Sequence, residues 1–147
     1  MQSAVSGVFY TRQTIYNKAN QDDMAQDKND FPENKGMELY EYIVDNVDAL
    51  PESPDEIVAK LRAVDNSGQF FASTARFLAA VDRERYEKWL TPLIEGAIER
   101  DRERRYIGSL LEAIWGADYE DRLEQLRQTD NNFRRIYRRI HPEDDAM

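Results

Sequence analysis

From Gly36 onward, apolar residues recur at the three- and four-residue spacing of a helix face, and this period constrains the fold more than any other feature. The first run ends before Pro51 and consists of Leu39, Ile43, Val47 and Leu50. Because Pro cannot continue a helix, we expect one helix from about Gly36 to the residue before Pro51.

The clearest helix start in the sequence is at Ser53. Its hydroxyl can cap a helix, Pro54 suits the first helical position, and Glu56 is placed to close a capping box. A helix over 53–64 is therefore expected, and the turn chemistry of Asp65-Asn66-Ser67-Gly68 should end it.

Further apolar stripes predict helices along the rest of the chain, and Trp89 and Trp115 lie on them as expected core residues. We expect a kink or short break at Thr91-Pro92. The segment 99–105 has no apolar member, and the intrahelical ion pairs Asp101–Arg105 and Glu99–Arg102 suit a polar helical crossing there. The expected stop and start signals are Gly116, Asp118, Thr129 or Asp130, and Pro142.

These elements predict an all-α fold, a compact bundle of about six or seven helices with a polar N-terminal arm. Residues 1–35 are the expected arm and linker, 36–141 the helical domain and 142–147 an acidic tail. The apolar beginning of the arm, residues 5–16, fits a short strand or a helical turn equally well. Residues 18–35 have the polar composition of a loop or tether.

Composition excludes several classes of chemistry. The 147 residues contain no Cys and one His, His141, so a disulfide framework, a thiol catalyst, a Cys-bearing zinc site and paired-His metal centres are excluded. No apolar stretch is long enough to span a membrane, and the N-terminus lacks a secretory signal pattern. We therefore expect a cytoplasmic protein that makes no membrane contact.

The net charge of −9 is unevenly distributed along the chain. Residues 1–65 hold 13 acidic and six basic side chains, four of them Lys. Residues 66–147 hold 16 acidic and 14 basic side chains, of which 13 are Arg. Arg favours planar, bidentate pairing with carboxylate or phosphate, so the second part is the better candidate for binding anions.

The last expected helix carries the most specific pattern. At about 100° per residue, its apolar residues share one face and four arginines share the other. The arginines are Arg134, Arg135, Arg138 and Arg139. They could bind the carboxylates of a protein partner or the phosphates of a nucleic acid, or form a solvated face that complements the helix dipole.

The first expected helix shows the opposite pattern, with four carboxylates on the face away from its apolar residues. They are Glu38, Glu41, Asp45 and Asp48. Oxygen ligands of this kind suit Mg²⁺ or Ca²⁺, but acids of a metal site in a helical bundle normally point inward. We therefore expect no metal site and no cofactor here, and interpret the acidic stripe as a surface that binds the arginines of another chain.

The sequence thus predicts a small acidic interaction module without catalytic residues, acting as a regulator, an inhibitor or a small subunit of an assembly. Its expected partner is another protein or a second copy of the chain, and the partner-binding residues are the four arginines and four carboxylates named above. A nucleic-acid-associated protein that uses the Arg-rich helix is the alternative, although a net charge of −9 opposes general binding to polyanions. An all-α Mg²⁺-dependent hydrolase is a third hypothesis.

Overall fold

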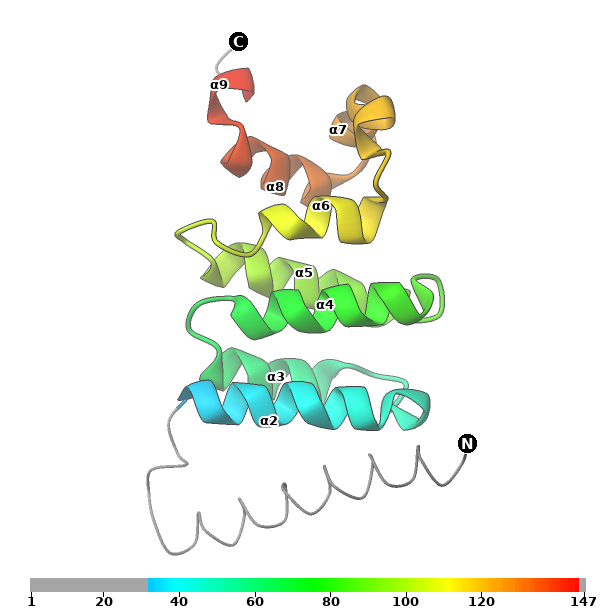
Figure 1. The fold of residues 1–147 in the computed structure, drawn as a ribbon, viewed down its shortest axis with the longest axis vertical. Coiled ribbons are helices and arrows are strands. Elements are labelled where there is room, and N and C mark those ends of the chain that lie inside the picture. The colour runs from blue at the N-terminus through cyan, green and yellow to red at the C-terminus, as the bar shows by residue number, and fades with distance from the viewer. Residues whose placement is uncertain (1–31, 146–147) are drawn as a thin grey trace, which may run out of the picture. The chain divides into compact units, whose positions relative to one another are not determined.

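Helices make up the regular structure of the computed structural model, which describes residues 32–145 (Figure 1). That range contains no strand, so the predicted all-α class is confirmed. In chain order the elements are α2 (Pro32–Asp45), the 3-10 turn η2 (Val47–Ala49), α3 (Asp55–Val64), α4 (Gln69–Asp82), α5 (Glu87–Arg100), α6 (Gly108–Trp115), the 3-10 turn η3 (Tyr119–Arg122), α7 (Leu123–Thr129), α8 (Asn131–Ile140) and α9 (Pro142–Asp145). The strand or helical turn considered for residues 5–16 lies outside the described residues.

The chain divides into two units, Met1–Leu50 and Pro51–Met147. In the first unit, the prediction that one helix continues through Val47 and Leu50 is wrong, because α2 ends at Asp45. The backbone and side-chain N–H groups of Asn46 both donate to the carbonyl oxygen of Tyr42, at 3.0 and 2.8 Å. An Asn that bonds the backbone in this way ends a helix readily.

In the second unit, α4 and α5 form the most extensive helix pair, and α6 packs on α4. The helix α8 packs on α6 and α5, α7 lies against α8, and α3 contacts α5. Gly96 lets α4 and α5 approach closely, since a Cβ at Gly96 would lie 2.5 Å from the ring of Phe71. A larger residue would push these two helices apart.

Both tryptophans are buried, at 3% and 4% exposure, which confirms Trp89 and Trp115 as core residues. The indole of Trp89 donates to the carbonyl oxygen of Pro51 at 3.2 Å, and that of Trp115 to Oδ2 of Asp130 at 2.7 Å. Of the two forms expected at Thr91-Pro92, the break is wrong, because α5 runs through Pro92 without interruption, and the kink stays a prediction.

The predicted start of α3 is only partly right. The helix begins at Asp55 and its N-cap is Pro54, without a side-chain cap bond. The Ser53 hydroxyl accepts from the Asp55 N–H at 3.2 Å, and Glu56 pairs with Lys60 and does not close a capping box. Two other signals act as predicted. Gly116 ends α6 with a φ of 99°. The α7–α8 junction is capped by Asp130, whose Oδ1 accepts from the N–H of Phe133 at 3.0 Å.

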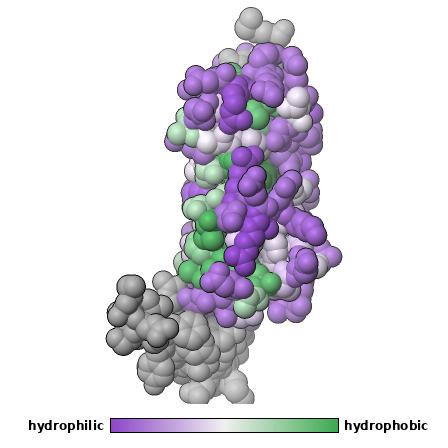
Figure 2. Space-filling view, turned by 90° about the vertical axis from the view of Figure 1, so that its right-hand side faces the viewer, coloured by the Kyte–Doolittle hydropathy of each residue, from purple (hydrophilic) through white to green (hydrophobic). Residues whose placement is uncertain are grey.

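Hydrophilic residues predominate on the face shown in Figure 2, and apolar residues reach the surface in smaller areas between them. The exposed large apolar side chains in the described part of the chain are Met37, Tyr42 and Val81, at 44%, 47% and 44%. No described helix is long and apolar enough to cross a membrane.

Candidate partner-binding surface

The helix α8 has the two faces that its sequence predicts. Phe133, Ile136 and Tyr137 are buried, whereas Arg138 is exposed and the other three arginines are half-buried. Arg134 donates to the carbonyl oxygen of Arg127 and to the side chain of Asn131, both at 2.8 Å. Arg135 donates to the side chain of Asn132 at 3.4 Å.

Arg139 links α8 to the end of α5. Its two terminal nitrogens donate to the carbonyl oxygens of Ile98 and Asp101, at 2.5 and 2.6 Å. In return, the Arg104 side chain donates to the carbonyl oxygen of Arg139 at 3.1 Å. The C-terminal ends of α5 and α8 are therefore each stabilised by a guanidinium group from the other segment, which also offsets the negative end of each helix dipole.

These arginines bond to uncharged oxygens. Within the described part of the chain, Arg134, Arg135 and Arg139 form no ion pair with a carboxylate. Backbone carbonyls and Asn oxygens orient the guanidinium groups without neutralising their net charge. No carboxylate among the described residues therefore balances the charge of these three guanidinium groups.

The segment 99–105 is not the polar helix that its sequence predicts. The helix α5 ends at Arg100, and Asp101 is buried, at 2% exposure. Its carboxylate accepts from the backbone N–H groups of Arg105, Tyr106 and Ile107 at 2.9, 2.6 and 2.8 Å. The carboxylate therefore organises the loop that leads into α6, and it does not form the expected pair with the Arg105 side chain.

Asp65 performs the same role between α3 and α4, at 1% exposure. Its Oδ1 accepts from the N–H groups of Ser67 and Gly68 at 3.3 and 2.9 Å. Its Oδ2 accepts from those of Phe70 and Phe71 at 3.0 and 2.8 Å. Four backbone donors at the start of α4 are thereby satisfied by one side chain.

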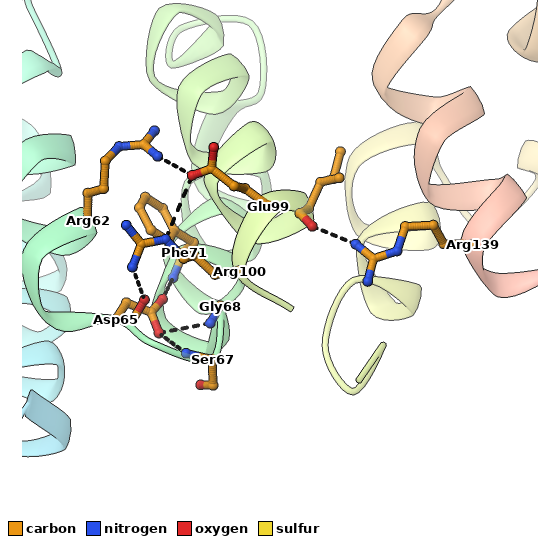
Figure 3. A network of polar contacts seen from close by, with 9 residues as sticks. Arg62, Asp65, Ser67, Gly68, Phe71, Glu99, Arg100 and Arg139 are labelled. Carbon is orange, nitrogen blue, oxygen red and sulfur yellow. Dashed lines mark hydrogen bonds and ion pairs between the residues drawn. The ribbon is translucent and has the colours of Figure 1, made fainter. Parts of the chain in front are cut away.

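A polar network connects α3 to the end of α5 beside this junction (Figure 3). Arg62 from α3 hydrogen-bonds Glu99 from α5. The Nε of the next residue, Arg100, lies 3.7 Å from Oε1 of Glu99, and its Nη1 donates to the backbone carbonyl of Asp65 at 3.2 Å. Glu99 therefore pairs with Arg62 and not with Arg102, the partner that helical spacing suggests.

We define the cationic surface as five arginines, two in the loop before α6 and three on α8. Its members are Arg104, Arg105, Arg135, Arg138 and Arg139. Glu103 pairs with Arg105 at 2.8 Å, and both side chains are about 70% exposed. The nearby Asp101 is buried, whereas Glu103, Arg104 and Arg105 are exposed.

The four predicted acidic residues belong to the first unit. Glu38, Glu41 and Asp45 lie on α2, whereas Asp48 lies in η2, so the stripe continues past the end of the helix. Glu41 and Asp48 are exposed, and Glu38 and Asp45 are half-exposed. No group of three or more His, Asp or Glu among residues 32–145 is placed to hold a metal ion.

A row of aromatic rings follows the inner side of α8. The ring centroid of Phe133 lies 5.2 Å from that of Trp115 and 5.8 Å from that of Tyr137. The ring centroids of Tyr137 and His141 are 4.5 Å apart. Tyr119 also packs on Phe133, and burial of its hydroxyl raises its pKa above the usual 10.0, with Glu120 and Glu112 adding to the effect. This row supports α8 from within the second unit.

Sequence reasoning missed the roles of Asp65 and Asp101. The turn residues after Asp65 were a usable signal, because Asp before a Gly-containing turn often accepts backbone N–H groups. Asp101 lies among charged residues with no Gly or Pro nearby, so nothing in the pattern distinguished it from a solvated acid.

No protein-family model matches the sequence, and no curated protein or solved structure shows significant similarity to it.

Proposed function

We propose that this protein is a non-catalytic interaction module whose cationic surface binds an acidic surface of a protein partner. The observation that supports this most is the separation of charge by burial at the ends of α5 and α8. There the carboxylate of Asp101 is enclosed by backbone N–H groups, while Arg104, Arg105 and Arg138 are exposed. A chain of net charge −9 thus presents a localised positive surface.

The geometry of the arginines favours carboxylate partners. Arg139 is held by two backbone carbonyls, so little of its side-chain entropy remains to be lost on binding. Guanidinium groups bind carboxylates through paired N–H donors, and partly oriented ones give specificity as well as attraction.

Overall charge favours a protein partner over a nucleic acid. A sequence pI near 4.7 means that most of the surface repels a polyanion at neutral pH. An acidic patch on a protein can contact the cationic surface alone, whereas an extended nucleic acid would also pass acidic parts of this chain.

The chain itself carries one surface of the required kind. The acidic stripe of α2 and η2 presents Glu41 and Asp48 to solvent, and a second copy could offer it to the arginines. Each exposed ion pair would contribute at most about 1 kcal/mol, so the association should weaken as salt is added.

Charge reversal at two positions tests the proposal. We expect Arg135→Glu with Arg138→Glu to abolish capture of the partner protein, because both side chains would then repel carboxylates. Arg83→Glu is the matched control, since Arg83 is exposed in the turn after α4. Loss of oligonucleotide binding with a steep salt dependence, and unchanged protein capture, would support the nucleic-acid alternative and contradict the proposal.

A further inference from the structure

A polar hollow of about 540 Å³ lies where the α3–α4 and α5–α6 junctions meet in the second unit. It is lined by Asn66 from the first junction and by Glu99, Arg100 and Arg102 from the second. Its size falls within the range of about 300–1,000 Å³ that is usual for small-molecule sites. None of these residues belongs to the cationic surface.

Two of the four lining side chains are available to a ligand. The side chains of Asn66 and Arg102 have no hydrogen-bond or ion-pair partner among the residues that the structure describes. Arg100 uses Nε toward Glu99 and Nη1 toward the carbonyl oxygen of Asp65, which leaves Nη2 as a further donor. The hollow therefore offers N–H donors from two guanidinium groups and one amide.

The neighbouring acids do not cancel this positive character. Glu99 is hydrogen-bonded by Arg62, so its charge already has a cationic partner. The carboxylate of Asp65, drawn with three of its donors in Figure 3, is buried and accepts four backbone N–H groups. That of Asp101 is also buried and accepts three. Those N–H dipoles stabilise the two buried charges locally.

The walls of the hollow are held in place by direct packing of the two junctions. A Cβ at Gly68 would lie 3.0 Å from both the backbone nitrogen and the Cβ of Asp101. Arg100 also joins the junctions through its bond to Asp65. Donors carried on such a fixed frame need little ordering when an anion binds.

We propose that this hollow binds the phosphate group of a small phosphate ester. Two guanidinium groups and an amide match the charge and the several acceptor oxygens of a phosphate dianion. The hollow is larger than a phosphate ion, so the rest of the ester can occupy it. The second carboxylate oxygen of Glu99 can accept a hydrogen bond from a hydroxyl group of the ligand.

The proposal goes beyond the proposed function and does not depend on it, since Arg135 and Arg138 play no part in the site. Arg135→Glu with Arg138→Glu should leave phosphate binding unchanged, and Arg102→Gln should leave partner capture unchanged. Failure of one proposal can thus be separated from failure of the other.

The test is calorimetric titration of the full chain with inorganic phosphate and with glycerol 3-phosphate, at constant ionic strength. We expect saturable one-site binding of both, with the ester bound at least as tightly as the free ion. Arg102→Gln should weaken binding at least tenfold. The control Arg83→Gln removes the same charge from the turn at the other end of the α4–α5 pair and should leave binding unchanged.

Three outcomes would overturn the proposal: no saturable binding of either phosphate probe, equal affinities of Arg102→Gln and Arg83→Gln, or tighter binding of acetate than of phosphate. The last would indicate a carboxylate site. Because the side chain of Arg102 is exposed and makes no contact that the fold needs, Arg102→Gln is expected to fold, as its circular dichroism spectrum can verify.

Discussion

The α3–α4 and α5–α6 junctions use the same device in loops of different length. Each has a buried Asp whose backbone N–H ends one helix and whose carboxylate accepts N–H groups leading into the next. At the first junction, α4 begins four residues after Asp65, and Gly68 provides the required positive φ of 85°. At the second, α6 begins seven residues after Asp101, and Arg104 has a positive φ of 60°.

The difference shows two ways of stabilising a tight turn. Gly adopts a positive φ without steric cost, so the φ of the first turn needs no tertiary contact to hold it. Arg does not adopt it readily, and its side chain holds the conformation by bonding the end of α8. The second junction therefore depends on a tertiary contact, and that contact gathers the arginines of the cationic surface.

The largest expected effect tests whether the two carboxylates are equivalent. Asp65→Ala and Asp101→Ala should each lower the free energy of unfolding by about 3 kcal/mol, because buried N–H donors lose their acceptor. Urea denaturation followed by circular dichroism measures the loss. Asp121→Ala, at an exposed position, should change stability by less than about 0.5 kcal/mol. A loss of that small size for Asp101→Ala would show that the second junction does not need its carboxylate.

The next effect concerns the contact between the junctions. Gly68→Ala should cost about 2 kcal/mol, because Ala disfavours the positive φ and its Cβ would press on Asp101. Gly108→Ala is the control, since its Cβ would meet only Ile140 at an ordinary 3.5 Å and Ala suits a helix better than Gly. Equal unfolding midpoints for the two variants would contradict the close packing of the junctions.

A smaller effect should distinguish the arginines at the two junctions. Arg139→Met should cost about 1.5 kcal/mol, because two carbonyl oxygens at the end of α5 lose a charged donor. Arg100→Met removes one longer bond to the Asp65 carbonyl and a half-exposed contact with Glu99, and should cost less, about 0.5–1 kcal/mol. The reverse order in thermal denaturation would mean that the first junction, and not the second, depends on tertiary contacts.

The smallest effect lies away from both junctions, at Tyr119. Its raised pKa means that the neutral phenol is favoured in the folded state. The neutral Tyr119 hydroxyl contributes its full share to the free energy of unfolding below the unfolded-state pKa of about 10. This contribution is lost as pH rises through the folded-state pKa. Ultraviolet titration should show a late-ionising component, and Tyr119→Phe should remove it. If the late component persists in Tyr119→Phe, the assignment is wrong.

Local chemistry explains which parts of the fold could be predicted from the sequence. The end of α6 at Gly116 and the cap at Asp130 depend on residues within a turn of each other, and these predictions are confirmed. The end of α5 at Arg100 depends on Asp101 being buried and on Arg139, 38 positions later, bonding its carbonyl. No local pattern reports such a contact, so helical spacing wrongly predicted that the helix continues over residues 99–105.

The candidate site also has a part that the sequence predicts and a part that it does not. The helical spacing of residues 131–140 was enough to predict that all four arginines share one side of a helix. Their hydrogen bonds to Arg127, Ile98 and Asp101 come from packing against other helices. The phosphate-binding hollow was equally hidden, because Asn66 and Arg102 meet only when the two junctions pack together.

Sedimentation of the full chain at low and high salt tests the central claim most directly, namely that the cationic surface of one copy binds the acidic stripe of a second copy. We expect the wild type to associate at low salt and to dissociate at high salt. Arg135→Glu with Arg138→Glu, and Glu41→Lys with Asp48→Lys, should each remain monomeric, and a mixture of the two double variants should associate, because each supplies one unaltered surface. A wild type that stays monomeric at both salt concentrations would contradict the claim.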